Sequence, residues 1–223
     1  MGDDRATVGL LARYATAKRL VLGILLLAAW PASATQEYIL PTLFDVAGVA
    51  ANDVLNIRAA PDASAEIIGT LAPDARDIEV VGYDDTGRWA RINTGGRGGW
   101  AALRYLAYQT DVWTPGALPP TLHCLGTEPF WSFRPEGDDI VFSTPEASES
   151  DMSIEQVLST GVFRDPRRSI LAGGDSRRMS AVMVPMACSD GMSDRSYGLD
   201  VTVILEERGE AQMLTGCCSI APK

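Results

Sequence analysis

Short runs in which apolar and polar residues alternate, separated by turn residues, cover positions 45–107 of the chain. Alternation with a period of two is typical of a strand that buries one face. We interpret residues 35–44 as a lead-in to this region. Strands this short and this closely spaced predict a small all-β barrel or sandwich. The expected strands are 54–58, 67–71, 78–83, 88–92 and 100–103, and the expected turns are 60–63, 84–87 and 94–99.

A second alternating region covers about 122–221. Its strongest strand signal is the β-branched run 199–205, and further strands are expected at 139–143, 168–172 and 179–184. Residues 146–160 fit a short helix or an acidic loop. Three prolines in residues 108–121 predict a semi-rigid linker between the two regions. The predicted fold class is therefore mainly β, with a small N-terminal barrel and a second antiparallel domain that is a barrel or a meander.

The first 34 residues carry the pattern of a signal peptide. Four basic residues precede an apolar run at 20–30, which is followed by Pro31 and by Ala32-Ser33-Ala34, an A-x-A cleavage site. Eleven helical residues span about 16 Å, whereas the apolar core of a bilayer is about 30 Å thick. An uncleaved amphipathic anchor is the alternative. We expect cleavage after Ala34, a periplasmic or secreted protein, and no stable membrane anchor after cleavage, since no cysteine stands there to take a lipid.

The chain is acidic: 29 Asp and Glu stand against 19 Lys and Arg, a net charge of −10. Removing residues 1–34, which hold four basic and two acidic residues, leaves a mature chain with a net charge of −12. This balance argues against nucleic acid as a partner, because phosphate binding needs a dense basic surface. It favours encounter with basic partners, although solubility alone also explains it.

The stretches LNIRAAPDASAEIIGTL, GRWARI and GRGGWAALRYL, within residues 45–107, resemble the bacterial Src-homology-3 domain family. Asn56 and Arg58 fall in the family's opening strand, and Gly69, Trp89, Gly99 and Trp100 match its recurring glycine and aromatic positions. The resemblance implies a small barrel that acts as a targeting or ligand-binding module, often at the cell wall. Trp89 and Trp100 fit the barrel core or its rim as well as a ligand contact.

The resemblance, together with the strand-and-turn order, predicts a binding rim of aromatic and acidic side chains. Carboxylates beside aromatic rings can hold a peptide that bears free amines, such as a wall stem peptide with a diamino acid. The expected partner is therefore a peptidoglycan peptide or an envelope protein. The candidate ligand-binding residues are Tyr83, Asp84, Asp85, Trp89, Trp100 and Tyr105.

The second region opens with CLGTEPFW and closes with CSDGMSDRSY and TGCC. These motifs resemble an uncharacterised family of secreted or lipid-anchored bacterial envelope proteins. The resemblance implies an envelope location and supplies no reaction. The sequence has no lipobox, so lipid anchoring is not expected for this chain.

All four cysteines, Cys124, Cys188, Cys217 and Cys218, lie in the second region. Export places them in an oxidising compartment, where disulfides are expected. Cys217 and Cys218 are neighbours and would point to opposite faces of a strand, so each needs its own partner. Cys124 then pairs with one and Cys188 with the other, and both assignments stay open.

No catalytic, cofactor or metal site is predicted. The chain has one histidine, His123, and no C-x-x-C, so a zinc site or a thiol oxidoreductase is not indicated. His123 and Cys124 would face opposite ways on a strand and form no dyad. The alternative hypotheses are a hydrolase that uses Glu128 with Asp190 or Asp194, and a periplasmic inhibitor of a cationic wall-degrading enzyme such as lysozyme.

Overall fold

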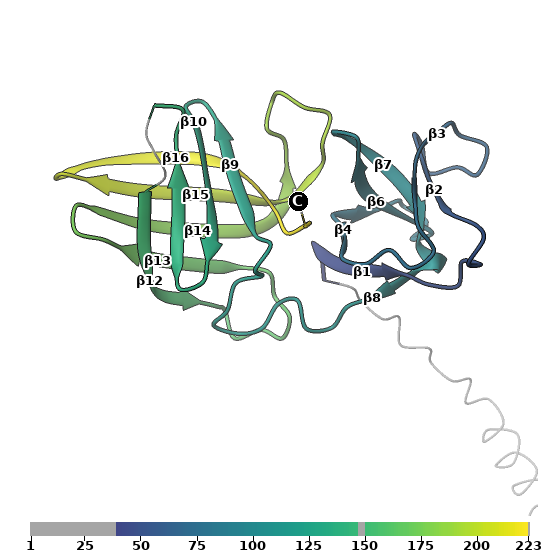
Figure 1. Ribbon diagram of the computed structural model, residues 1–223, viewed down its shortest axis with the longest axis horizontal. Helices are drawn as coiled ribbons and strands as arrows, with labels where there is room; N and C mark the ends of the chain where they lie inside the picture. The colour runs from purple at the N-terminus through teal and green to yellow at the C-terminus, as the bar shows by residue number, and fades with distance from the viewer. Residues whose placement is uncertain (1–38, 147–149, 223) are drawn as a thin grey trace, which may run out of the picture. The chain divides into compact units, whose positions relative to one another are not determined.

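The computed structural model describes residues 39–146 and 150–222, which fold as two β regions (Figure 1). The signal peptide predicted at 1–34 lies outside the described residues. Strands β1–β8 form two small sheets, which we call the two-sheet region, and strands β9–β16 form a closed barrel. The predicted fold class is confirmed: the chain is mainly β, and the second region is an antiparallel barrel stapled by two disulfides.

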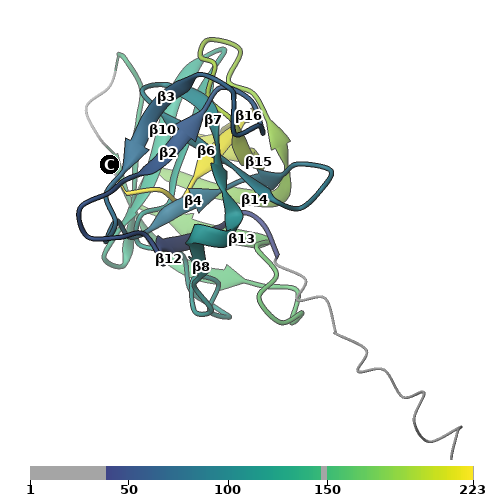
Figure 2. The same cartoon turned by 90° about the vertical axis from the view of Figure 1, so that its right-hand side faces the viewer.

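The two-sheet region surrounds a core of its own. Phe44, Ile57, Val80 and Ile92 are among its fully buried side chains. The three-stranded sheet has the order β4 (Ile78–Val80), β1 (Thr42–Val46) and β8 (Leu106–Tyr108). The five-stranded sheet, turned toward the viewer in Figure 2, has the order β3 (Ile67–Leu71), β2 (Leu55–Arg58), β7 (Arg97–Ala102), β6 (Trp89–Thr94) and β5 (Gly82–Tyr83). A 3₁₀ turn, η1 (Leu103–Tyr105), connects β7 to β8.

Three local expectations in this region need correction. The run 78–83 is two strands, because β4 joins the three-stranded sheet while β5 pairs with β6. The turn predicted at 94–99 is shorter: only Gly95 and Gly96 adopt positive φ, 55° and 82°, and β7 begins at Arg97. Part of the predicted lead-in is strand β1, which pairs with both β4 and β8. Apolar residues of β1 contribute to the core, which is why this segment is ordered into a sheet.

The barrel closes because its first strand, β9 (His123–Thr127), pairs with both β10 and the last strand, β16. Closure leaves no unpaired strand edge. The segment 146–160, expected to be a helix or an acidic loop, contains strand β12, with Met152 buried in the core. The remaining strands are β10 (Phe130–Glu136), β11 (Asp139–Ser143), β12 (Ser150–Leu158), β13 (Arg168–Gly173), β14 (Arg177–Cys188), β15 (Tyr197–Glu207) and β16 (Glu210–Ser219).

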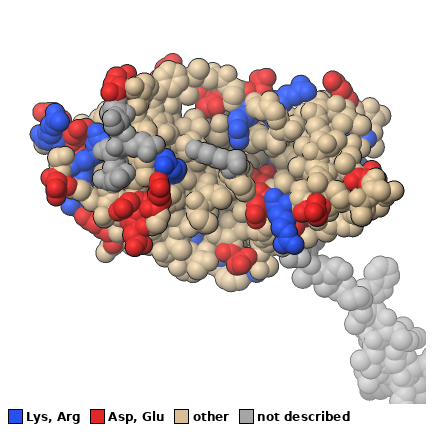
Figure 3. All heavy atoms as spheres, viewed as in Figure 1, with Lys and Arg blue, Asp and Glu red and all other residues tan. Residues whose placement is uncertain are grey.

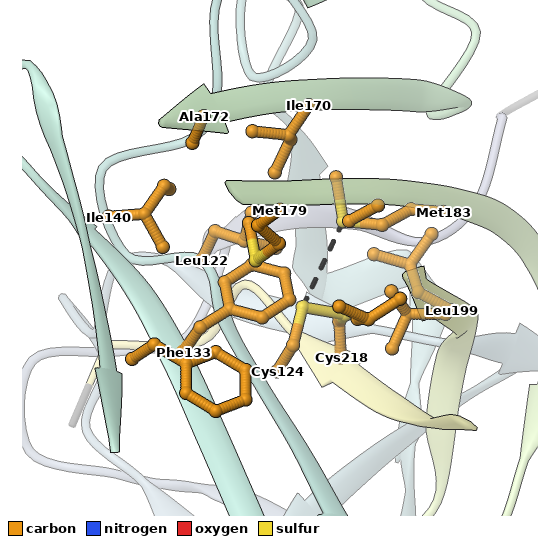
Figure 4. Packing of buried hydrophobic residues seen from close by; sticks show 14 of the residues in the cluster. Leu122, Cys124, Phe133, Ile140, Ile170, Ala172, Met179, Met183, Leu199 and Cys218 are labelled. Atoms are coloured by element: carbon orange, nitrogen blue, oxygen red, sulfur yellow. Dashed lines mark hydrogen bonds between the residues drawn. A yellow bond between two sulfur atoms is a disulfide. The ribbon is translucent and has the colours of Figure 1, made fainter. Parts of the chain in front are cut away.

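Apolar side chains fill the barrel (Figure 4). Phe133, Met179 and Leu199 point inward from three different strands and pack around the Cys124–Cys218 disulfide. The indole of Trp131 stacks 5.9 Å from the rings of Phe133 and Phe142. Interior glycines make room for it, because a Cβ on Gly126 would lie 2.1 Å from Trp131 Nε1. The barrel interior is thus a packed core.

The proline-containing segment 108–121 packs on the barrel. Trp113 is buried in the barrel core, and its Nε1–H donates a 2.7 Å hydrogen bond to the backbone oxygen of Pro41. The guanidinium of Arg168, also buried, donates to the backbone oxygens of Thr114 and Ala117 at 3.0 and 3.1 Å. The segment predicted as a linker therefore has fixed contacts on both sides.

The two-sheet region and the barrel meet through hydrogen bonds between distant parts of the chain. Asn93 and Ser196 exchange two bonds, both 2.8 Å long. Arg91 Nε–H donates to the hydroxyl of Ser196 at 2.9 Å, and the Gly98 N–H donates to the backbone oxygen of Asp194 at 2.7 Å. In residues 39–146 and 150–222, no helix is long and apolar enough to cross a membrane. Acidic and basic side chains are interspersed on the face drawn in Figure 3.

Candidate functional site

A groove of about 450 Å³ lies on the two-sheet region, which we call groove A. Trp89, at the start of β6, and Tyr105, at the end of η1, supply its aromatic surface. Backbone hydrogen bonds fix both residues, since the backbone oxygen of Trp89 accepts the Asp84 N–H at 3.0 Å and the backbone oxygen of Tyr105 accepts the Ala47 N–H at 2.9 Å. Groove A is lined by Gly48, Val49, Ala50, Asp53, Val54, Leu55, Asn56, Arg58, Ala63, Trp89, Ala102, Arg104 and Tyr105.

Two guanidinium groups give groove A its charge. Arg58 is held in place, because its Nη1–H donates a 2.7 Å bond to the backbone oxygen of Ala65. Arg104 lies over the ring of Tyr105, with Cζ 4.6 Å from the ring centroid. Asp53 is the acidic residue of the lining, and its carboxylate accepts the Val54 N–H at 2.8 Å. The groove therefore offers fixed cationic groups beside aromatic rings.

The structure places two of the six predicted rim residues in groove A and four outside its lining. Trp89 and Tyr105 face the groove, whereas Tyr83, Asp84, Asp85 and Trp100 do not line it. Trp100 sits under the guanidinium of Arg91, with Cζ 5.0 Å from the ring centroid. Tyr83 packs against the core of the two-sheet region. Residues that are neighbours in a turn or strand do not all project from the same face. This is why only two of the six predicted residues line groove A.

The Asp84 carboxylate holds its own turn together. It accepts hydrogen bonds from the Thr86 hydroxyl and from the backbone N–H groups of Trp89, Arg88 and Thr86, the last three at 2.7, 2.8 and 3.1 Å. Desolvation alone would raise the pKa of Asp84, but these hydrogen bonds outweigh it and lower the pKa to about 2. The Asp84 carboxylate thus stabilises the β5–β6 turn, and the hydrogen bonds of that turn occupy its acceptor sites.

A second and larger groove, of about 770 Å³, lies on the barrel, and we call it groove B. The two sequence motifs of the second region meet there, because the Thr127 hydroxyl donates a 2.9 Å hydrogen bond to the backbone oxygen of Asp190. Groove B is lined by Leu125, Gly126, Thr127, Glu128, Phe130, Cys188, Ser189, Asp190, Gly191, Met192, Asp200, Thr215 and Gly216.

Of the carboxylates suggested for a hydrolase, Glu128 and Asp190 line groove B, and Asp194 does not. Asp190 organises its loop by accepting bonds from Met192 N–H, Ser193 N–H and hydroxyl, and Tyr197 hydroxyl, at 2.7–3.2 Å. Partial burial would raise the pKa of Asp190, but these bonds outweigh it and lower the pKa. Asp190 therefore serves as the anchor of the 189–193 loop.

The disulfides confirm that adjacent cysteines take separate partners. Cys124 pairs with Cys218 inside the barrel, and Cys188 pairs with Cys217 on the outer side. The register shift between Pro185 and Cys188 ends regular pairing of β14, and Cys188 bonds to a cysteine of β16 beyond the intervening β15. Cys188 also lines groove B, so the second disulfide fixes one of its walls.

Sequence reasoning missed several residues of both grooves. Arg104 precedes the predicted rim residue Tyr105, and Asp53 precedes the predicted strand at 54–58. Neither residue belongs to a motif of its own. Asp200 of groove B sits within the strongest strand signal, where an alternating polar residue reads simply as solvent-facing. Among the described residues, no group of three or more His, Cys, Asp or Glu side chains is arranged to hold a metal ion.

Residues 53–107 match the family model of the bacterial SH3 domain. This range covers β2 to β7 and contains ten of the thirteen residues that line groove A. No curated protein and no solved structure matches the chain significantly.

Proposed function

We propose that the chain is an exported binding protein of the bacterial envelope, whose SH3 domain holds a carboxylate-bearing cell-wall peptide in groove A. The family match to residues 53–107 supports a binding role. The observation that carries the finer proposal is the pairing of aromatic rings with guanidinium groups in one groove, namely Trp89 and Tyr105 with Arg58 and Arg104.

The charge of groove A favours a ligand with carboxylates. A guanidinium presents a planar fork of N–H donors that matches a carboxylate, and two fixed guanidinium groups favour an anionic end or side chain. Aromatic rings add contact area against the apolar parts of a peptide at low entropic cost. The amine-bearing ligand expected from the sequence required Asp84 and Asp85 in the binding rim, and neither lines the groove.

Cell-wall stem peptides carry free carboxylates as well as amines, so the chemistry of groove A is compatible with the expected partner. The two disulfides favour export, because such bonds persist in oxidising compartments. Binding, rather than catalysis, is the role that the groove's arrangement supports best.

Co-sedimentation of residues 35–223 with purified peptidoglycan tests the proposal. We expect the protein to pellet with peptidoglycan at low salt, and Arg104→Gln to weaken this association at least several-fold. Arg76→Gln removes an equal charge from an exposed site outside groove A and serves as the matched control. Equal binding by all three proteins, or no binding by the wild type, would count against the proposal.

A further inference from the structure

Groove B differs from groove A in both charge and apolar exposure. Its lining contains the carboxylates of Glu128, Asp190 and Asp200 and no Lys, Arg or His. Two large apolar side chains beside it are open to solvent, Phe130 at 51% and Met192 at 69% exposure. Exposed apolar surface in a groove whose charged lining residues are all acidic is complementary to a ligand with basic and apolar groups side by side.

Hydrogen bonds and a disulfide hold the walls of groove B in place, and they leave the carboxylates of Glu128 and Asp200 accessible. Asp190 is committed to its loop, whereas Glu128 is exposed and follows directly after the anchored Thr127. Asp200 projects from β15, and its Oδ2 lies 3.9 Å from Sγ of Cys188. The Cys188–Cys217 disulfide therefore positions the 188–192 loop beside Asp200, and two carboxylates remain for a ligand.

We propose that groove B is a second binding site, independent of groove A, for a peptide segment that presents lysine or arginine beside an apolar side chain. The basic groups pair with Glu128 and Asp200, and the apolar side chain packs on Phe130 and Met192. A basic segment of a protein partner fits this chemistry. An acidic protein would also draw such a partner toward it at low ionic strength, since opposite net charges speed encounter.

Titration of ¹⁵N-labelled residues 35–223 with the peptide acetyl-Gly-Lys-Phe-Lys-Gly-amide tests this site. We expect amide shifts at Thr127, Ser189, Gly191 and Gly216, and binding that weakens with added salt. The peptide with glutamates in place of both lysines should bind at least tenfold more weakly. No shifts in the groove at millimolar peptide, or equal affinity for the two peptides, would overturn the proposal.

Two variants separate a charge contribution from loss of fold. The double change Glu128→Gln with Asp200→Asn should weaken binding of the lysine peptide at least tenfold, and Glu128→Gln alone should weaken it severalfold. The matched control is Asp175→Asn with Glu210→Gln, at exposed hairpin turns of the barrel's other end. Unchanged affinity in a correctly folded Glu128→Gln variant would contradict the assignment. Peptidoglycan binding through groove A is expected to persist in all these variants. The peptide titration therefore tests groove B, and the peptidoglycan assay tests groove A.

Discussion

Glu79 on β4 accepts a 2.5 Å hydrogen bond from the hydroxyl of Ser219, which lies 140 residues later at the end of β16. The other carboxylate oxygen accepts the Ile220 N–H at 2.9 Å. Glu79 is buried, so the last residues of the barrel are tied to a buried acid in the two-sheet region. This bond is one of several that join the region holding groove A to the barrel holding groove B.

Replacing Glu79 with glutamine should flatten the pH dependence of stability. Burial raises the pKa of Glu79 above 4.5, although hydrogen bonds from Ser219 and Ile220 and the charge of Arg195 oppose the rise. At this group the folded protein binds more protons than the unfolded chain, so the contribution of Glu79 to stability is greatest below about pH 4.5 and is lost as pH rises through the folded pKa. Urea unfolding at several pH values should show a smaller fall in Glu79→Gln, and an identical slope in both proteins would contradict this.

Removing each disulfide should have a different effect on the barrel. The Cys124–Cys218 bond spans 94 residues and the Cys188–Cys217 bond spans 29. In the chain-entropy model these loops correspond to about 4.5 and about 3.5 kcal/mol of stability. We expect Cys124→Ala with Cys218→Ala to destabilise the barrel more than removal of the Cys188–Cys217 bond does. The gap should exceed the difference between the two loop contributions, because removing the buried sulfurs also leaves a cavity.

Loss of the outer disulfide should affect groove B specifically. Cys188→Ser with Cys217→Ser frees the loop that carries Ser189 to Met192, so the lysine peptide should lose most of its affinity while the barrel remains folded. Circular dichroism and peptide titration on the same sample check both parts. Full retention of peptide affinity would show that the disulfide does not shape the groove.

The adjacent residues Asp84 and Asp85 should respond differently to neutralisation. Asp84→Asn replaces a carboxylate that accepts bonds from Thr86, Arg88 and Trp89, so the melting temperature should fall. Because hydrogen bonding lowers the pKa of Asp84 to about 2, its contribution is present above pH 3.8 and is lost as pH falls toward 2. Asp85→Asn should leave both melting temperature and peptidoglycan binding unchanged. Thermal melts at pH 2 and pH 6 distinguish the two variants.

Gly126 tolerates no side chain. A Cβ there would lie 2.1 Å from Trp131 Nε1 and 2.8 Å from the backbone oxygen of Thr215, so Gly126→Ala should destabilise the barrel by about 1–3 kcal/mol or more. Gly82→Ala is the control, because its Cβ would meet its nearest neighbour, in Arg91, at an ordinary 3.7 Å. Denaturant unfolding measures both, and equal stability of the two variants would refute the packing argument.

Local alternation was enough to predict most of the strands. The β-branched run at 199–205 lies within β15, and the run at 67–71 coincides with β3. Alternation fails to predict a strand where pairing with neighbouring strands determines the structure. The acidic stretch that contains β12 forms a strand because it pairs with β11 on one side and with β13 on the other. Nothing in its own composition favours that outcome.

The candidate sites were harder to predict because they are assembled from distant segments. Trp89 and Tyr105 were found through the family resemblance, but their groove partners Arg58 and Arg104 were not assigned to the binding rim. The two motifs of the second region converge on groove B through a hydrogen bond over 63 residues, a contact that spacing alone does not reveal. Adjacent cysteines on a strand, by contrast, must face opposite ways, so part of the disulfide pattern followed from the sequence.

The most direct test of the central claim compares two soluble wall stem peptides, one with free carboxylates and one with the same groups amidated. Titration of each into ¹⁵N-labelled residues 35–223 reports both affinity and location. The account predicts tighter binding of the free-carboxylate peptide, with shifts at the indole of Trp89 and the amides of Asn56 and Arg104, and loss of that preference in Arg104→Gln. Equal affinity for the two peptides, or shifts confined to residues outside groove A, would contradict it.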